Sequence, residues 1–387
     1  MRVLEEGPAN GARGLEHSPE LDGIRGLAIL LVLVWHYFVS QLALAAGTPA
    51  WWLARSGALT WSGVDLFFEL SGYLLGSILV RHRGGENYYA AFYLRRVCRI
   101  VPLYLVLLAA YLAIALWLRD PANPGHRWLF DRAMPFWSYA TFTQNIVMAY
   151  ANTSGAHFLG ITWSLAVEEQ FYLVLPLTIA ILPPRALPWV LAGLVAAAPF
   201  VRGEIYAGGL DAFVLTPARM DSLLCGVLLA SLLQQPRARA WFEARRRFMG
   251  WLLALFFVGI VVLTIQPGIF GFFNHTWLAI FFALLMALGL THREGVIAAG
   301  LRWRWLGGLG ILSYSVYLFH QAVSGLVHAT LLRRAPRIDS LESAAVTLFA
   351  LGITLGIALL TLRYVERPAV RAGRRLAYGF RAAPQPA

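Results

Sequence analysis

Two side chains that can carry charge, Arg25 and His36, stand in the first long hydrophobic segment of the sequence. They are eleven residues apart. On an α-helix that is close to three turns, so both would lie on one face, about 16 Å apart along the axis. An ionisable side chain such as that of His36, deep inside a membrane-spanning helix, is costly to bury in lipid and indicates a functional site. The alternative is a histidine whose polar atoms are satisfied by a neighbouring helix.

Further polar side chains interrupt the later hydrophobic segments. Asp65 and Glu69 stand in the second segment, Glu168 and Glu169 in the fourth, and His320 in the ninth. Histidine and carboxyl groups at similar depths suit general acid–base chemistry. Adjacent residues point about 100° apart on a helix, so only one of the two adjacent glutamates can face a shared partner.

Arginines gather just before the third hydrophobic segment, at Arg95, Arg96 and Arg99. Residues three and four apart share one face of a helix. A cluster of guanidinium groups there suits phosphate binding, and the alternative is anchoring to the cytoplasmic surface or to anionic lipid. Arg219 and Asp221 open the sixth segment, where they form either part of a site or an interfacial salt bridge.

The composition is that of a membrane protein that crosses the bilayer many times. The chain has 387 residues, of which 59% are hydrophobic, and a mean hydropathy of +0.62. All 32 basic residues are arginine, and the net charge is +12. The arginines are spread over short connections, so membrane orientation explains the charge better than nucleic-acid binding does. Cys98 and Cys225 are interpreted as structural.

The elements that must position these side chains are about ten transmembrane helices, and the fold class is all-α and polytopic. The distribution of arginines predicts that both termini are cytoplasmic. Residues 1–23 are expected to be a cytoplasmic segment, 24–368 the transmembrane domain, and 369–387 a disordered basic tail. The predicted segments are 24–44, 62–80, 101–118, 162–182, 186–201, 216–233, 250–266, 274–291, 305–331 and 343–362.

Seven stretches of the sequence, in order, resemble the motifs of the membrane-bound acyltransferase 3 family. The most specific resembles the family's Trp-Ser-Leu-x-x-Glu-x-Gln-Phe-Tyr pattern. Glu69 departs from the family pattern, which usually has an apolar residue at that position. The matching stretches are Leu21–His36, Gly63–Tyr73, Phe92–Tyr104, Trp163–Tyr172, Arg219–Gly226, Ser313–His320 and Glu366–Pro368.

This resemblance implies an O-acyltransferase in the bacterial cytoplasmic (inner) membrane. The expected donor is acetyl-coenzyme A or another acyl-coenzyme A, the acceptor is a carbohydrate or glycolipid hydroxyl, and neither a metal nor nucleic acid is expected. The implied catalytic residues are His36 as general base, Glu168 and Asp22. The implied donor-binding residues are Arg25, Arg95, Arg96, Arg99 and Tyr104. The implied acceptor-binding or site-lining residues are Asp65, Glu69, Ser164, Glu169, Tyr172, Arg219, Asp221, Tyr317 and His320.

Other functions remain open from the sequence. Membrane-embedded acids and histidines also build proton relays, so a proton-coupled transporter is one alternative. A transporter would more often show two related halves, and no internal repeat stands out here. A lipid-binding structural protein is another alternative, but it does not explain polar residues at matched depths. Within acyl transfer, the acceptor could be an antibiotic or a lipid, and the route could pass through an acyl-histidine.

Overall fold

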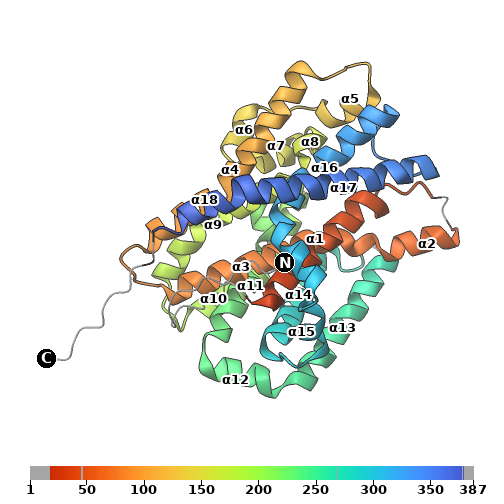
Figure 1. Cartoon of the computed structure of the whole chain (residues 1–387). Helices are drawn as coiled ribbons and strands as arrows, with labels where there is room; N and C mark the ends of the chain where they lie inside the picture. Colours follow the sequence, from red (N-terminus) through yellow and green to blue (C-terminus); the bar gives the residue numbers. More distant parts are fainter. Residues whose placement is uncertain (1–17, 45–46, 267, 377, 379–387) are drawn as a thin grey trace.

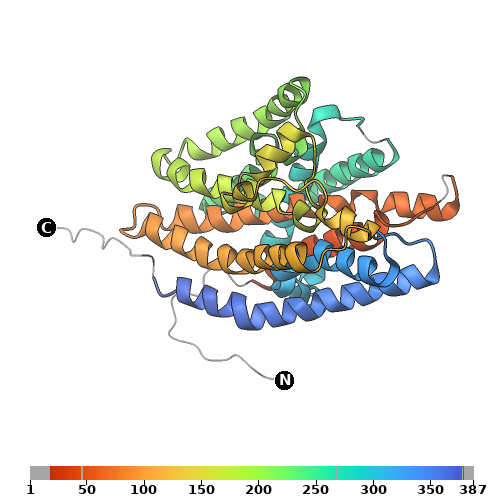
Figure 2. The same ribbon diagram turned by 90° about the horizontal axis from the view of Figure 1, so that it is seen from above.

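The computed structural model describes residues 18–44, 47–266, 268–376 and 378. Within these residues the chain forms helices and no strands, and its one isolated β-bridge joins Leu42 to Ile338. Figures 1 and 2 show the long helices lying alongside one another, with short helices in the connections. The all-α fold is therefore confirmed.

Ten long helices form the body of the protein. They are α1 (Pro19–Leu33), α3 (Gly63–Arg81), α4 (Tyr88–Trp117), α9 (Trp163–Ile181), α10 (Leu187–Ala207), α11 (Thr216–Leu233), α13 (Arg246–Ile265), α14 (Asn274–Thr291), α16 (Arg304–Leu332) and α17 (Leu341–Thr361). The shorter helices are α2 (Pro49–Ser56), α5 (Pro124–Phe130), α6 (Phe136–Ala140), α7 (Gln144–Ala151), α8 (His157–Gly160), α12 (Pro236–Ala244), α15 (Val296–Leu301) and α18 (Arg367–Gly373). Single 3₁₀ turns cover Ala58–Ser62, Ala212–Val214 and Gly271–Phe273.

Nine helical segments in the described part of the chain are long and apolar enough to cross a membrane. They correspond to nine of the ten predicted segments, and the protein is a polytopic membrane protein. The remaining predicted segment forms α16, which at 29 residues is long enough to cross. It is not one of the nine, and it carries buried serines and histidines that lower its hydropathy. Helix α16 packs against α1 and α17.

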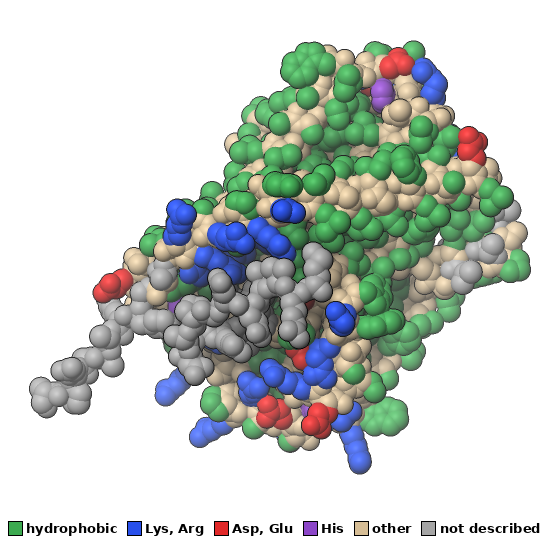
Figure 3. Space-filling view, in the orientation of Figure 1, with side chains coloured by type: hydrophobic (Ala, Val, Ile, Leu, Met, Phe, Trp, Pro, Cys, Tyr) green, Lys and Arg blue, Asp and Glu red, His purple; other side chains and the backbone are tan. Residues whose placement is uncertain are grey.

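Arginine side chains gather at one end of the helices. This end, called the basic end below, carries the start of α1, the end of α3, and helices α12, α15 and α18. Figure 3 shows basic side chains concentrated around α12, α15 and α18, while hydrophobic side chains cover most of the rest of that face. Such an uneven distribution is the usual sign of a protein oriented in a membrane.

Two π-helical turns depart from the expected α-helical geometry. The first, Val34–Val39, follows α1 directly and contains His36. The α-helical spacing between Arg25 and His36 is therefore interrupted, and the helix ends before the predicted limit at residue 44. The second turn, Leu362–Glu366, lies between α17 and α18. Pro368 stands in the first turn of α18, so the helical path continues past residue 368, the predicted limit of the transmembrane domain. The rest of the predicted tail, residues 377 and 379–387, lies outside the described residues.

Glycines allow two pairs of helices to approach closely. Between α3 and α11, a Cβ atom on Gly226 would overlap the Glu69 carbonyl, and one on Gly72 would overlap the Leu223 carbonyl. Between α1 and α16, a Cβ atom on Gly310 would overlap the Asp22 carbonyl. Small residues at such crossings let backbones pack directly, which is a main source of helix association in membranes.

We expect Gly226→Leu to destabilise the protein by about 1–3 kcal/mol or more, because the added side chain must displace the α3 backbone. Gly352→Leu is the matched control, since no atom lies within 4 Å of a Cβ at that α17 position. The measurement is the midpoint of thermal unfolding in detergent, which should fall only for Gly226→Leu. Equal midpoints for the two variants would contradict the packing described here.

Candidate functional site

A cavity of about 150 Å³ lies among helices α1, α3, α4, α9 and α16. Its lining combines apolar side chains with a set of polar and charged ones. The charged residues are Arg25, Arg96, Arg99 and Glu168. The hydroxyl-bearing residues are Ser71, Ser164, Tyr172, Ser313, Tyr314 and Tyr317. We call this the central cavity.

Two of the three cavity arginines are held by carboxylates. Arg25 donates to Asp22 at 2.6 Å, and Arg99 forms an ion pair with Glu366, which also accepts from Ser315 at 3.0 Å. Among the described residues, Arg96 forms no ion pair; the Glu169 carboxyl and the Tyr172 hydroxyl lie within its electrostatic reach. Arg96 is thus the arginine in this set best able to bind an anion that enters the cavity.

Asp22, Arg95 and Tyr104, three residues that the sequence predicts to act in catalysis or donor binding, do not line the central cavity. Asp22 pairs with Arg25 near the start of α1, so it orients one of the cavity arginines. Arg95 donates to the Leu376 carbonyl at 3.1 Å and lies over the Tyr378 ring, outside the central cavity. Tyr104 is buried and donates to the Tyr139 carbonyl at 3.0 Å, so it holds α4 to α6 and does not line the cavity.

The acidic side of the central cavity is built on α9. Glu168 lines the cavity and interacts with Ser71 of α3 and Tyr172, whose hydroxyls also bond to each other. Glu169 does not line the cavity, and one of its oxygens is buried with no hydrogen-bond partner in the described part of the chain. The two adjacent carboxylates are therefore separated, as the sequence predicted. Ser164, one turn earlier, bonds to the Tyr317 hydroxyl at 2.6 Å.

Two histidines face each other beside the central cavity. The rings of His36 and His320 are 4.7 Å apart in an edge-to-face arrangement, and the Tyr317 ring of the cavity wall lies 5.6 Å from that of His320. Nδ1 of His36 is 3.0 Å from the Val32 carbonyl, and Nδ1 of His320 is 2.6 Å from the Tyr317 carbonyl. A carbonyl accepts a hydrogen bond only, so each Nδ1 carries the proton and each Nε2 is left as an acceptor.

The two histidines differ in access. His320 is fully buried, and its Nε2 has no hydrogen-bond partner among the described residues. His36 is only partly buried. Of the two, His36 is therefore the more exposed, and neither ring is part of the lining of the central cavity.

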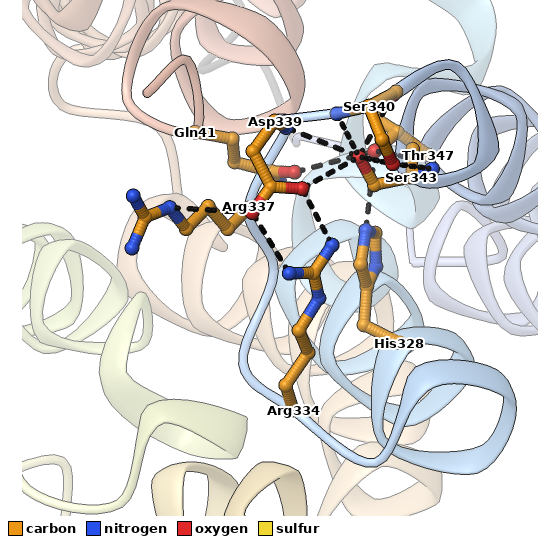
Figure 4. A network of polar contacts seen from close by, with 8 residues as sticks. All are labelled: Gln41, His328, Arg334, Arg337, Asp339, Ser340, Ser343 and Thr347. Atoms are coloured by element: carbon orange, nitrogen blue, oxygen red, sulfur yellow. Dashed lines mark hydrogen bonds and ion pairs between the residues drawn. The ribbon is translucent and has the colours of Figure 1, made fainter. Parts of the chain in front are cut away.

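A hydrogen-bond network holds the chain just after His36, and sequence reasoning did not identify it. The side-chain amide of Gln41 donates to the His36 carbonyl at 2.5 Å and to Ser324 at 3.3 Å. Its oxygen accepts from Thr347 at 3.4 Å, and Thr347 also bonds to His328 at 3.2 Å. Figure 4 shows the side chains of Gln41, His328 and Thr347 converging from the segment after α1, from α16 and from α17. The network ties the π-helical turn to both neighbouring helices.

The same network reaches the connection between α16 and α17. Ser343 caps α17 reciprocally with Ser340 and also donates to Asp339, which binds Arg334 through both carboxylate oxygens (Figure 4). The hydrogen bonds from Arg334 hold the pKa of the Asp339 carboxyl below its usual value. Asp339 therefore keeps its charge at neutral and mildly acidic pH, and the contact is lost only as the pH falls through that lowered pKa.

Three residues predicted to line the site instead form a buried ionic cluster. Asp65 of α3 accepts from Arg219 of α11 at 2.9 Å, and Arg219 also bonds to His275 of α14. Asp221 accepts from Arg202 of α10 at 2.5 Å. All of these side chains are buried, and none lines the central cavity. Arg202 and His275 belong to the same cluster, because both are buried against the acids of neighbouring helices.

Glu69 remains without a hydrogen-bond partner. Its side chain is fully buried, and neither carboxyl oxygen has a partner among the described residues. The charged groups that act on it are the acids Asp65 and Asp221. Glu69 is therefore unpaired among the described residues, and it does not line the central cavity.

A comparison with protein families identifies the chain. A family model described as "Acyltransferase domain" (acyltransferase 3) matches residues 18–363. The chain belongs to this acyltransferase family. The cavity with its arginines, its carboxylate and its adjacent histidines is therefore the candidate active site of an acyltransferase. Among the described residues, no group of three or more His, Cys, Asp or Glu side chains could hold a metal ion.

Curated bacterial relatives carry names that agree with this family. An "O-acetyltransferase OatA" of Staphylococcus aureus is 27% identical over 382 residues, which cover 92% of this chain and 58% of the relative. A "Peptidoglycan O-acetyltransferase OatA" of Listeria monocytogenes is 24% identical over 373 residues, covering 91% and 56%. The acyltransferase thus spans a little over half the length of these relatives. No solved structure matches the chain.

We expect Asp65→Leu to lower the free energy of unfolding of this acyltransferase by about 3–5 kcal/mol, because Arg219 is left buried without its carboxylate. The double variant Asp65→Leu/Arg219→Met should recover much of that loss, since no buried charge remains unpaired. Unfolding in detergent, followed by tryptophan fluorescence, measures both.

The control for this pair of variants is Asp131→Ala. Asp131 binds Arg119 at 2.6 Å, but both side chains are more than a third exposed. Its loss should cost less than about 1 kcal/mol. A double variant that is no more stable than Asp65→Leu alone would contradict the assignment of Asp65 as the counter-ion of Arg219.

Proposed function

We propose that this acyltransferase moves an acyl group, in the simplest case acetyl, from a cytoplasmic acyl-coenzyme A to a hydroxyl of a carbohydrate or glycoconjugate acceptor. His36 acts as the general base. The observation that carries the proposal is the position of the central cavity, which has arginines and Glu168 in its wall and the histidine pair beside it. A phosphate-bearing thioester and a proton acceptor can meet in such a space.

The arginines support the donor half of the proposal. Coenzyme A carries several phosphate charges, and guanidinium groups are well suited to bind them. Arg25 and Arg99 are already oriented by Asp22 and Glu366, while Arg96 has no ion-pair partner among the described residues. We therefore assign Arg96 to donor binding, with Arg25 and Arg99 providing the surrounding positive charge.

The histidines support the second part of the proposal, the transfer of the acyl group to the acceptor hydroxyl. The acceptor hydroxyl gives its proton to Nε2 of His36 as its oxygen forms a bond with the thioester carbonyl carbon. The carbon–sulfur bond then breaks, and the coenzyme A thiolate leaves and takes the proton back from the His36 imidazolium. Glu168, with Ser71 and Tyr172 beside it, is assigned to holding acceptor hydroxyls.

The relatives support a carbohydrate acceptor. One of them is named a peptidoglycan O-acetyltransferase, and peptidoglycan hydroxyls belong to sugars outside the cytoplasmic membrane. We therefore propose that the basic end faces the cytoplasm, that both termini lie there, and that the protein resides in the bacterial inner membrane. The donor then enters from the basic end and the acceptor from the opposite side.

We expect His36→Ala to lower the rate of acetyl transfer by about 10²–10⁴-fold, because the acceptor hydroxyl loses its base. The assay measures transfer of labelled acetyl from acetyl-coenzyme A to glycan fragments by the purified protein in nanodiscs. His126→Ala, a histidine that accepts a bond from the Asp120 backbone far from the cavity, is the control. Unchanged transfer by a folded His36→Ala protein would refute the assignment.

We expect Arg96→Ala to weaken binding of acetyl-coenzyme A by about tenfold or more, since a charged hydrogen bond contributes about 1.5–3 kcal/mol. Arg95→Ala is the matched control, because Arg95 is the adjacent arginine of α4 and lies outside the central cavity. Calorimetric titration of both variants in neutral-lipid nanodiscs measures the difference. Equal losses in the two variants would show that general positive charge, rather than the cavity, binds the donor.

A further inference from the structure

A second pocket, which we call the basic-end pocket, opens between α1, α3, α11, α12 and α14. Its volume is about 500 Å³, more than three times that of the central cavity. Tyr73, Ser77 and Gln234 contribute polar groups to its wall. The side chains of Arg81, Arg239 and Arg293 complete the lining. The proposed reaction assigns no role to this pocket.

The charge of the basic-end pocket is mainly positive. Arg81 and Arg293 form no ion pair among the described residues, and Arg239 binds Glu243 at 2.9 Å in an exposed pair on α12. An acid also lines the pocket: Glu20 is buried and binds Arg302 at 3.4 Å. Because both acids already have arginine partners, the pocket retains excess positive charge for an anion.

The wall of this pocket offers neutral hydrogen-bonding groups as well as charge. The Tyr73 side chain is almost fully buried on α3 and lies within the electrostatic reach of Arg81 and Arg239. Ser18 and Thr291 contribute further hydroxyls. Apolar side chains of α11 and α14, Leu233 and Leu290, provide a surface on which a flat ring can rest.

The volumes of the two pockets suggest that different parts of the acyl donor bind in each of them. Pockets that enclose ligands of nucleotide size measure about 300–1,000 Å³, so the central cavity is too small for the nucleotide part of an acyl-coenzyme A. The basic-end pocket is large enough. Helices α1 and α3 contribute to both spaces: Arg25 lines the central cavity, and Leu21, one turn away, lines the basic-end pocket. That turn corresponds to about 6 Å along the helix.

We propose that the basic-end pocket is a binding site for a phosphate ester of nucleotide size. Such a ligand would place its phosphate group beside the arginines and its organic part against the apolar wall. One source of this chemistry is the adenosine 3′,5′-bisphosphate end of the acyl donor, and this identification rests on the proposed function. The other source is the headgroup of an anionic phospholipid, which does not depend on it.

The test uses the full-length protein in phosphatidylcholine nanodiscs and the probe adenosine 3′,5′-bisphosphate, which carries no acyl arm. The triple variant Arg81→Gln/Arg239→Gln/Arg293→Gln should bind the probe at least about tenfold more weakly than wild type, because three charged donors are lost. The matched control is Arg237→Gln/Arg245→Gln/Arg247→Gln. It removes the same charge from exposed positions at the same end that do not line the pocket, and it should bind the probe like wild type.

A second arm identifies the lipid source. The thermal midpoint in detergent is measured with added short-chain phosphatidylglycerol or phosphatidylcholine. If wild type does not bind the nucleotide probe but is stabilised by phosphatidylglycerol, and the pocket variant is not, the ligand is a lipid headgroup and the phosphate site stands. If the pocket variant and the control behave alike in both arms, the proposal is overturned.

The two arms also separate this inference from the proposed function. His36→Ala keeps the basic-end pocket intact, so it should bind adenosine 3′,5′-bisphosphate as wild type does even though its acetyl transfer is strongly reduced. If coenzyme A is not the donor, the nucleotide arm fails in wild type, while the lipid arm still reports on the pocket.

Discussion

The direct contact between α1 and α16 is the constraint on which the candidate active site depends. At the basic end, Gly26 meets the backbone of α16 at Leu306, and Gly310 meets the backbone of α1 at Asp22. Both helices run in the same direction from this contact, and His36 and His320 each stand ten residues beyond the glycine of their own helix. A crossing that admits no side chain fixes the register, so the two imidazoles meet.

A second constraint comes from the charges that the membrane helices bury. Asp65 and Arg219 bring α3 and α11 together, and Asp221 brings α11 to Arg202 of α10. The Arg219 guanidinium also lies 5.7 Å from the ring of Phe68, which lines the central cavity. The ionic cluster therefore packs behind Phe68, on the side of that residue away from the central cavity. Without their partners these charges would be very costly in the bilayer, which makes the arrangement of the helices specific.

The fold could be predicted from the sequence more fully than the site. The membrane helices can be recognised in the sequence as long hydrophobic segments. A chain that crosses a membrane must form all its backbone hydrogen bonds internally, as a helix does. The placement of Glu168 and His320 on long helices followed from the same analysis of the hydrophobic segments. Lateral neighbours did not follow, since nothing in the sequence pairs Arg219 of α11 with His275 of α14. The π-helical turn was also invisible, because its extra residue per turn depends on tertiary contacts such as those of Gln41.

The Gln41 network clarifies which role the polar residues beyond His36 can have. A chain of Gln41, Thr347 and Ser343, with His328 bonded to Thr347 at its side, leads away from the histidine pair toward Asp339, and it resembles a route for protons. However, it meets His36 at the backbone carbonyl and not at the ring, and neither that carbonyl nor an amide side chain passes a proton on. The network is therefore a support that fixes the π-helical turn from one side, as the glycine contact fixes α1 from the other. In the proposed reaction, a proton taken up by His36 therefore returns to the leaving thiolate and does not pass along this network.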